Sequence, residues 1–308
     1  CVSRLLFMPG KLLQMDCLLN DWAEAPGGGL LPPERSPACP EPVPLGPRQH
    51  RALQSGLFRV DESVFCAGQI ALVPCTMQLV KAGTRTQARL SFSYVEKVLE
   101  AVISSLTLAH VVQAHCYTTK HQHIPIIRAA WESMLRTTEE EKDLMCEHAI
   151  KPAPLLVVVV PALPKGAAVE LHVTAVQDDP TQRTSCHMTT KVACGSIECH
   201  TVMSACSASL SLSLAVPGDN LEVTGVKDVT EAVGATLKKA MKKMAAELVP
   251  LCARVFYKCN HPLAQQIVEG LEESLRSSLA DSSPSVALVP VLDLPDSEIV
   301  HLSCWLSL

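Results

Sequence analysis

The chain has 308 residues, which is long enough for two ordinary domains that each bury a core. Its residues are 48% hydrophobic and 19% charged, as in a globular protein, while a net charge of −5 and only 4% aromatic residues disfavour a nucleic-acid binder. No stretch approaches the roughly 20 apolar residues that cross a bilayer, and no secretory leader is evident. The chain begins at Cys1 rather than methionine, which we interpret as a fragment or processed remainder of a longer protein.

Residues 1–44 are rich in glycine and proline. Three consecutive glycines, Gly27-Gly28-Gly29, are followed by Pro32-Pro33 and by four prolines within residues 37–44. Neither a helix nor a sheet is sustained through such a composition. The sequence therefore predicts a poorly defined linker here.

The segment 45–178 alternates strand-like and helix-like patterns. Residues 58–72 predict one or two strands, and residues 87–106 form the clearest amphipathic helix of the chain. A strand follows at 111–117, and a second helix is expected to begin near Pro125, because proline is tolerated in a first turn.

A short apolar run closes this segment. Residues 155–160 are continuously aliphatic, residues 161–167 carry two prolines and a glycine, and a second strand-like stretch then includes Glu170. Two strand-length runs around a Pro/Gly turn are typical of a hairpin. We therefore predict a β-hairpin at the edge of the core.

The same order of elements recurs in residues 184–308. Serines alternate with apolar residues at period two, which indicates strands rather than a membrane span. The predicted elements are strands over 186–216, a helix over 229–248, a strand at 253–257, a helix from Pro262 and a hairpin over 286–306.

The spacing of one motif is also repeated. Leu163-Pro164 precedes Val169-Glu170-Leu171 by the same interval that separates Leu294-Pro295 from Val300-His301-Leu302. Elements that match in order and in spacing predict two tandem copies of one module. The copies are expected at 45–178 and 184–308.

Fourteen cysteines are present, but their pattern does not indicate disulfides or a metal site. Several of them lie inside apolar segments, where a free thiol behaves as a small hydrophobic group, and no CxxC pair occurs. Cys194, Cys199 and His200 lack the spacing of a zinc site. We therefore expect reduced thiols, no bound metal and a cytoplasmic protein.

Several motifs of the first module resemble one family. The string LPKGAAVEL at 163–171, the string AGQIAL at 67–72 and the turn Gly46-Pro47 with Gln49 resemble the signature of the RidA (YjgF) family of small trimeric imine deaminases. The resemblance implies an α+β, chorismate-mutase-like fold. Each module would be a mixed sheet with two helices packed on one face.

The resemblance also implies a ligand cleft that is altered here. In the family an arginine grips the substrate carboxylate at the position of Leu155, and an acid stands at the position of Glu170. A leucine has no guanidinium fork with which to hold a carboxylate. In the second module the counterpart of Glu170 is His301. Glu170 is the remaining catalytic candidate, and we predict that the deaminase activity of the family is lost. The candidate residues of the cleft are Leu155, Gly68, Gln69, Glu170 and His301.

Two diverged modules in tandem also resemble the carboxyl-terminal half of the long-form diphthine–ammonia ligases. That family amidates a modified histidine of translation elongation factor 2. Its chemistry belongs to an amino-terminal ATP-pyrophosphatase domain with an S-G-G-K-D-S loop, which is absent from this chain. The resemblance therefore implies ATP only for a missing domain and no cofactor in this chain.

The primary hypothesis is a non-catalytic assembly or binding module. Its implied partners are elongation factor 2 and further copies of itself, associated through sheet faces in the trimeric manner of the family, with neither DNA nor a membrane as a partner. Two alternatives remain open: an imine deaminase with altered substrate recognition, and an independent small-molecule sensor. The lysines of the second module's first helix predict a solvated face, with an acidic partner or RNA as the alternative: Lys238, Lys239, Lys242 and Lys243.

Overall fold

The computed structural model describes residues 57–140, 153–217, 226–244, 248–278 and 285–308. Residues 56–308 form one compact unit by their contacts. The predicted linker at 1–44 and the turn at Gly46-Pro47 lie outside the described residues. None of the described helices is both long and apolar enough to cross a membrane.

The first half of the described chain, residues 57–176, is a mixed sheet with two helices. The sheet has five strands in the order β1-β2-β7-β5-β6, and β5 and β6 are its one parallel pair. A separate two-stranded ribbon, β3-β4, precedes the first helix. The bounds are β1 Leu57–Val60, β2 Ser63–Ile70, β3 Leu72–Val73, β4 Gln78–Leu79, α2 Thr84–Val102, β5 Val111–Thr118, α3 Ile124–Glu140, β6 Leu155–Val159 and β7 Val169–Val176.

The second half, residues 184–307, repeats this topology with one additional strand. Its six strands lie in the order β12-β11-β13-β10-β9-β8, and the parallel pair is β11 with β12. The strand that enters the sheet last, β13, lies between β11 and β10 just as β7 lies between β5 and β2. The bounds are β8 Thr184–Val192, β9 Gly195–Met203, β10 Ser207–Ala215, α4 Val226–Lys242, β11 Val249–Lys258, α5 Pro262–Ser278, β12 Ser285–Val291 and β13 Glu298–Ser307.

The prediction of two β-hairpins is wrong. β6 and β7 are not paired with each other, because β5 lies between them, and β11 separates β12 from β13 in the same way. The connection at 160–168 is nine residues long by the bounds of β6 and β7, whereas tight hairpins use two to five. This length carries the chain across one intervening strand. The strands themselves occur where the sequence predicts them.

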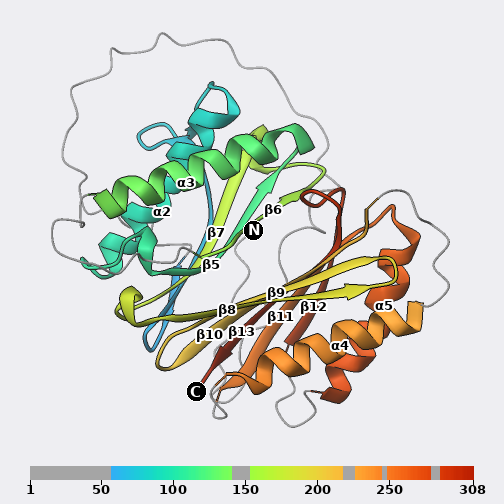
Figure 1. The fold of residues 1–308 in the computed structure, drawn as a ribbon. Helices are drawn as coiled ribbons and strands as arrows, with labels where there is room; N and C mark the ends of the chain where they lie inside the picture. Colours follow the sequence, from blue (N-terminus) through green and yellow to red (C-terminus); the bar gives the residue numbers. More distant parts are fainter. Residues whose placement is uncertain (1–56, 141–152, 218–225, 245–247, 279–284) are drawn as a thin grey trace. The chain divides into compact units, whose positions relative to one another are not determined.

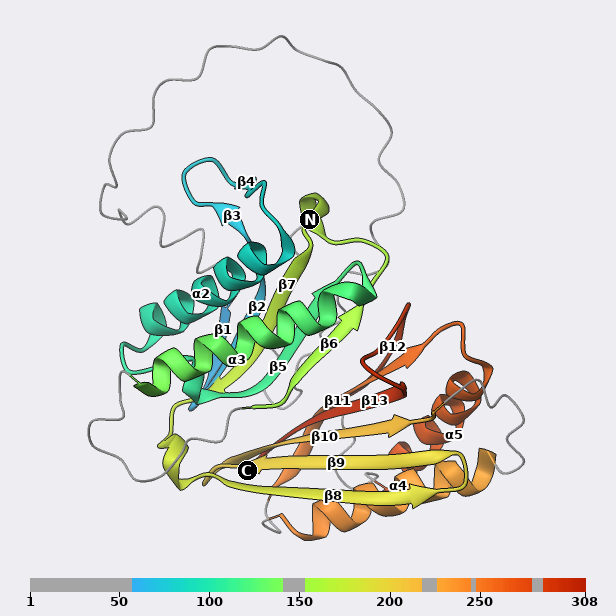
Figure 2. The same cartoon turned by 45° about the horizontal axis from the view of Figure 1, so that its top comes forward.

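Each sheet is covered by its two helices on one face (Figures 1 and 2). In α2 the buried residues Ala88, Phe92, Val95 and Leu99 recur every three or four positions and form the apolar stripe that packs on the sheet. The ring of Phe92 meets Trp131 of α3 edge-on, with 5.4 Å between ring centroids. α2 ends four residues before the predicted boundary, because Ile103 is already extended.

The opposite faces of the two sheets pack against each other (Figure 2). One apolar cluster joins β6 to the second half and contains Val158, Val160, Phe256, Val291 and Leu294. At the other end of the interface the ring of Phe65 meets Trp305 edge-on, at 6.0 Å between centroids. The two halves therefore share a buried interface.

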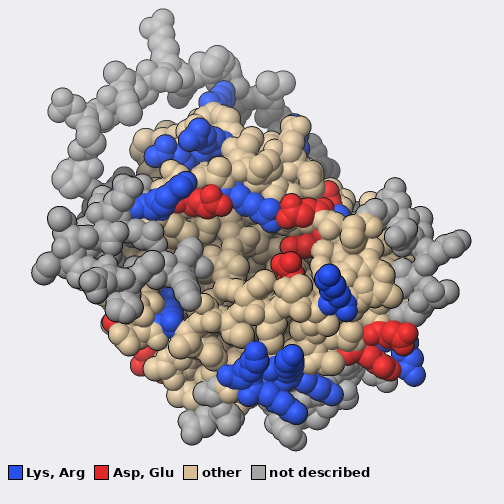
Figure 3. Space-filling view, in the orientation of Figure 1, with Lys and Arg blue, Asp and Glu red and all other residues tan. Residues whose placement is uncertain are grey.

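The cysteines and lysines follow the sequence-based expectations within the described residues. Cys66, Cys116, Cys199 and Cys304 are buried free thiols, and burial raises the pKa of Cys66 to about 12. Lys238, Lys239 and Lys242 of α4 are exposed, as is Lys243 directly after the helix, and the four lysines form a basic patch (Figure 3).

Candidate functional site

Leu155 begins β6 and lines an open pocket of about 380 Å³ beside α3. His200 of β9 lines the same pocket, so both halves contribute to it. One guanidinium, that of Arg128, is also present; its Nη1 donates to the exposed Asp296 carboxylate at 3.0 Å. The predicted cleft residue Leu155 therefore presents an aliphatic side chain to this pocket, and the guanidinium of Arg128 is already paired.

Glu170 lies on the face of β7 that is directed away from the helices. Its Oε1 accepts from His172 Nε2 at 3.0 Å, and both side chains are largely buried. Gly68, at a bulge in β2, makes room for this pair: a Cβ built there would lie 1.7 Å from Glu170 Oε1. Gln69 instead donates to the backbone carbonyl of Ala67. Gly68 and Glu170 thus lie next to each other, and the cleft itself stays a prediction.

Leu155 and Glu170 are not brought together within the first half. Glu170 pairs with Tyr117 of β5, whereas Leu155 pairs with Ala114 of that strand, three residues away. β5 also separates the strands that carry them. The described residues of the first half therefore do not form a single site from the two cleft positions.

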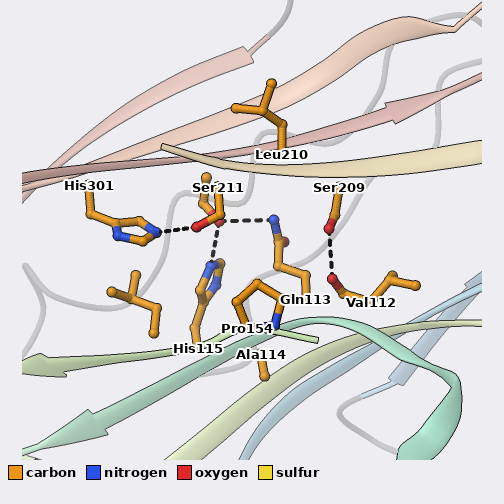
Figure 4. A pocket seen from close by; sticks show the side chains of 11 residues that line it. Val112, Gln113, Ala114, His115, Pro154, Ser209, Leu210, Ser211 and His301 are labelled. Atoms are coloured by element: carbon orange, nitrogen blue, oxygen red, sulfur yellow. Dashed lines mark hydrogen bonds between the residues drawn. The ribbon is translucent and has the colours of Figure 1, made fainter. Parts of the chain in front are cut away.

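His301 faces the first half across the interface (Figure 4). Its Nε2 lies 2.8 Å from Ser211 Oγ, and its Nδ1 lies 3.1 Å from Glu298 Oε2. Two groups hold both ring nitrogens, which fixes the orientation of the ring. His301 is therefore a partnered, buried histidine.

His115 of β5 is the centre of the polar contacts between the halves. Arg254 Nη1 approaches its Nδ1 at 3.4 Å, and a guanidinium is only a donor, so Nδ1 accepts and Nε2 carries the proton. Nε2 then donates to Ser303 Oγ at 2.8 Å, and Gln113 donates to the same oxygen at 3.0 Å. Burial, followed by the nearby charge of Arg254, lowers the pKa of His115 well below its ordinary value.

The cavity between the halves is almost filled by these side chains. It measures about 10 Å³, which is the space of a single water molecule. Residues from both sheets line it, and Figure 4 shows how they converge. The lining includes Gln113, His115, Leu156, Ser211, His301 and Ser303. No organic substrate fits into this volume.

Sequence patterns signalled this cluster only indirectly. The alternating serines of β10 predict a strand but not what its polar face contacts. Ser209 and Ser211 face the other sheet, and Ser209 Oγ donates to the Val112 carbonyl at 2.7 Å. His115, Arg254 and Ser303 were not singled out. Within the described part of the chain, no group of three or more His, Cys, Asp or Glu side chains is arranged to hold a metal ion.

Comparison with known proteins assigns a family to part of the chain. The family described as Endoribonuclease L-PSP matches residues 50–177. A comparison with curated proteins gives no match.

Solved structures with similarity to the chain include three bacterial proteins. RidA from an Antarctic Psychrobacter is 24% identical, with a TM-score of 0.32, and covers 39% of this chain and 85% of its own. E. coli TdcF with bound serine is 23% identical, with a TM-score of 0.34, and covers 40% and 87%. A putative endoribonuclease from Thermotoga maritima is 22% identical, with a TM-score of 0.33, and covers 40% and 85%. The family match supports a domain of the Endoribonuclease L-PSP (RidA/YjgF) type at residues 50–177, which is less than half of the chain.

Proposed function

We propose that the chain is a non-catalytic assembly or binding module built from two RidA-like halves. The observation that carries the proposal is Leu155, an aliphatic side chain that cannot clamp a carboxylate and that β5 separates from Glu170. The cavity of about 10 Å³ between the halves, which neither residue lines, holds a water molecule but no imine substrate. The repeated strand order of the second half supports a second, diverged RidA-like module.

The wider context that we propose is the carboxyl-terminal region of a cytoplasmic diphthine–ammonia ligase. The support is the resemblance of two tandem, diverged modules to that region, and elongation factor 2 would then be the partner. ATP would bind only to an amino-terminal domain. The test is the upstream coding sequence: an S-G-G-K-D-S loop in the same reading frame is expected, and a start codon at or just before Cys1 would exclude the ligase.

An imine deaminase is the second candidate, and one observation favours it. Glu170 is kept beside His172 over Gly68, so the acid of the resembled family remains in place. Ammonia release from 2-aminoacrylate distinguishes the two functions. We expect none from the purified chain, and none from Leu155→Arg, because the added guanidinium would lie one strand away from Glu170 of its own half.

The matched control for this assay is Glu170→Gln, which keeps the size of the side chain and removes its charge. Turnover by the unmodified chain that disappears in Glu170→Gln would refute the non-catalytic proposal and support the deaminase. Turnover that is unchanged in Glu170→Gln would indicate a contaminating activity, which a repeat with independently purified protein removes.

A further inference from the structure

Two pairs of residues occupy equivalent positions in the two halves. His115 of β5 and Arg254 of β11 each lie between the last strand of their half and the parallel edge strand, at the same register. Tyr117 and Phe256 follow two residues later in the same strands. The equivalence follows from strand pairing and does not depend on residue identity.

These equivalent residues meet each other across the interface. Arg254 Nη1 lies 3.4 Å from His115 Nδ1, and the rings of Tyr117 and Phe256 are 6.5 Å apart between centroids. The apolar cluster also draws on equivalent positions from both halves, as in the pairs Val158 with Val289, Val160 with Val291, and Leu163 with Leu294. A surface that meets its own counterpart is the mark of a two-fold, isologous contact.

The backbone bridge between the halves has no symmetric counterpart. Val159 N donates to the Asp293 carbonyl at 2.9 Å, and Leu292 N donates to the Val159 carbonyl at 2.8 Å. By register, the symmetry-related donors would be the backbone nitrogens of residues 290 and 161. Both positions are proline, which has no N–H. The bridge can therefore form on one side only.

We infer that the two halves form a built-in pair, closed about a local two-fold axis, and that Pro161 and Pro290 account for its one-sided backbone bridge. In an isologous contact each face takes the other as its partner, so no equivalent face is left for further copies. This inference goes beyond the proposed function. It predicts a single-chain particle in place of the trimeric association expected from the family resemblance.

The charges at the axis favour the pairing of unlike halves. If two second halves from different copies paired in this way, Arg254 would face Arg254, and like charges repel. In the observed pairing the guanidinium instead faces a neutral imidazole that accepts its hydrogen bond. Arg254 is therefore a specificity-determining residue of this interface.

The first test is the mass of the full chain in solution, measured by light scattering over a wide range of concentration. A mass near 33.2 kDa at all concentrations is the expected result. A stable trimer or dimer would overturn the closed pair. This measurement needs no variant, so it decides the question even if a substituted chain fails to fold.

The second test supplies the missing donors with Pro161→Leu and Pro290→Val, which copy the equivalent residues Leu292 and Val159. Hydrogen exchange should show the new amides protected, at an unchanged mass, because the second bridge belongs to the same interface. Pro180→Leu, which lies outside both bridges, is the matched control. A higher mass in the double variant, or new amides that exchange as fast as those of an open loop, would refute the two-fold arrangement.

Discussion

The pair of Glu170 and His172 exists because residue 68 has no side chain, and Gly68→Ala tests this dependence. An added Cβ would lie 1.7 Å from Glu170 Oε1 and 2.6 Å from His172 Nε2. Both atoms are at the ends of side chains, so the backbone of the sheet has no need to move. We expect the carboxylate to rotate away and its hydrogen bond to His172 to break.

The expected cost follows from what that rotation removes. A hydrogen bond to a charged group contributes about 1.5–3 kcal/mol, and here the two side chains are only 16% and 15% exposed. Alanine lowers the conformational entropy of the unfolded chain relative to glycine, and this effect offsets roughly 0.5 kcal/mol of the lost stability. The free energy of unfolding should therefore fall by about 1–2.5 kcal/mol, which corresponds to a decrease of roughly 2–10 °C in Tm for a unit of this size.

A double-mutant cycle with Glu170→Ala isolates the contact. Urea unfolding of the four chains gives the free energies, and in the Glu170→Ala background the alanine at position 68 should cost less than in the unmodified chain, because only its contact with His172 Nε2 remains. If Gly68→Ala is equally costly with and without the carboxylate, contact with the carboxylate is not the cause, and His172 or the backbone of the bulge is responsible. If it costs nothing in either background, the pair contributes nothing to stability.

Three further predictions concern the interface and its connections. Burial lowers the pKa of His115 well below 6.5, so as the pH falls the unfolded chain takes up the proton first. The free energy of unfolding should therefore decrease below pH 6.5, by at most about 1.4 kcal/mol per pH unit. Urea unfolding at several pH values should show this slope in the unmodified chain and not in His115→Gln, and equal slopes would contradict the assignment. Arg183→Met should cost about 3–5 kcal/mol, measured in the same way, since it leaves the largely buried Asp178 carboxylate unpaired; a loss below about 1 kcal/mol would show that water replaces the guanidinium. Trp305→Ala should cost about 3–5 kcal/mol by opening a cavity beside Phe65, and a normal Tm in that variant would show that the halves do not depend on this contact.

The elements could be predicted from the sequence because their signals are local. The stripe of α2 and the aliphatic run of β6 each depend on residues within a few positions of one another, and both elements occur close to their predicted bounds. Strand pairing depends on residues far apart in the chain. The Pro/Gly connection after β6 therefore suggested a hairpin, although β5, some forty residues earlier, occupies the place between β6 and β7.

The site was predictable only in part, for a related reason. Motif resemblance points to both Gly68 and Glu170, and the Glu170 carboxylate occupies the space that a Cβ at position 68 would need. The contacts of His115 could not be anticipated, because alternation on a strand distinguishes two faces but not what covers them. Polar residues on the face of a sheet opposite its helices predict that this face is exposed to water. Here another sheet covers that face, so Ser211 and Ser303 bond to histidines.

A covalent link between two halves of the same topology changes what a substitution can do at their contact. In an assembly of identical subunits every contact is the same, so a residue that fills one cleft fills them all. Here position 115 is histidine and its equivalent, 254, is arginine, and this difference permits a donor to face an acceptor on the local axis. Glu170 and His301, at equivalent positions of the two sheets, likewise differ, and each has its own partner. The cavity beside His301 and the pocket beside Leu155 are therefore separate places: the first, at about 10 Å³, has no space for an organic ligand, whereas the second, at about 380 Å³, has space but is lined by an aliphatic side chain at position 155.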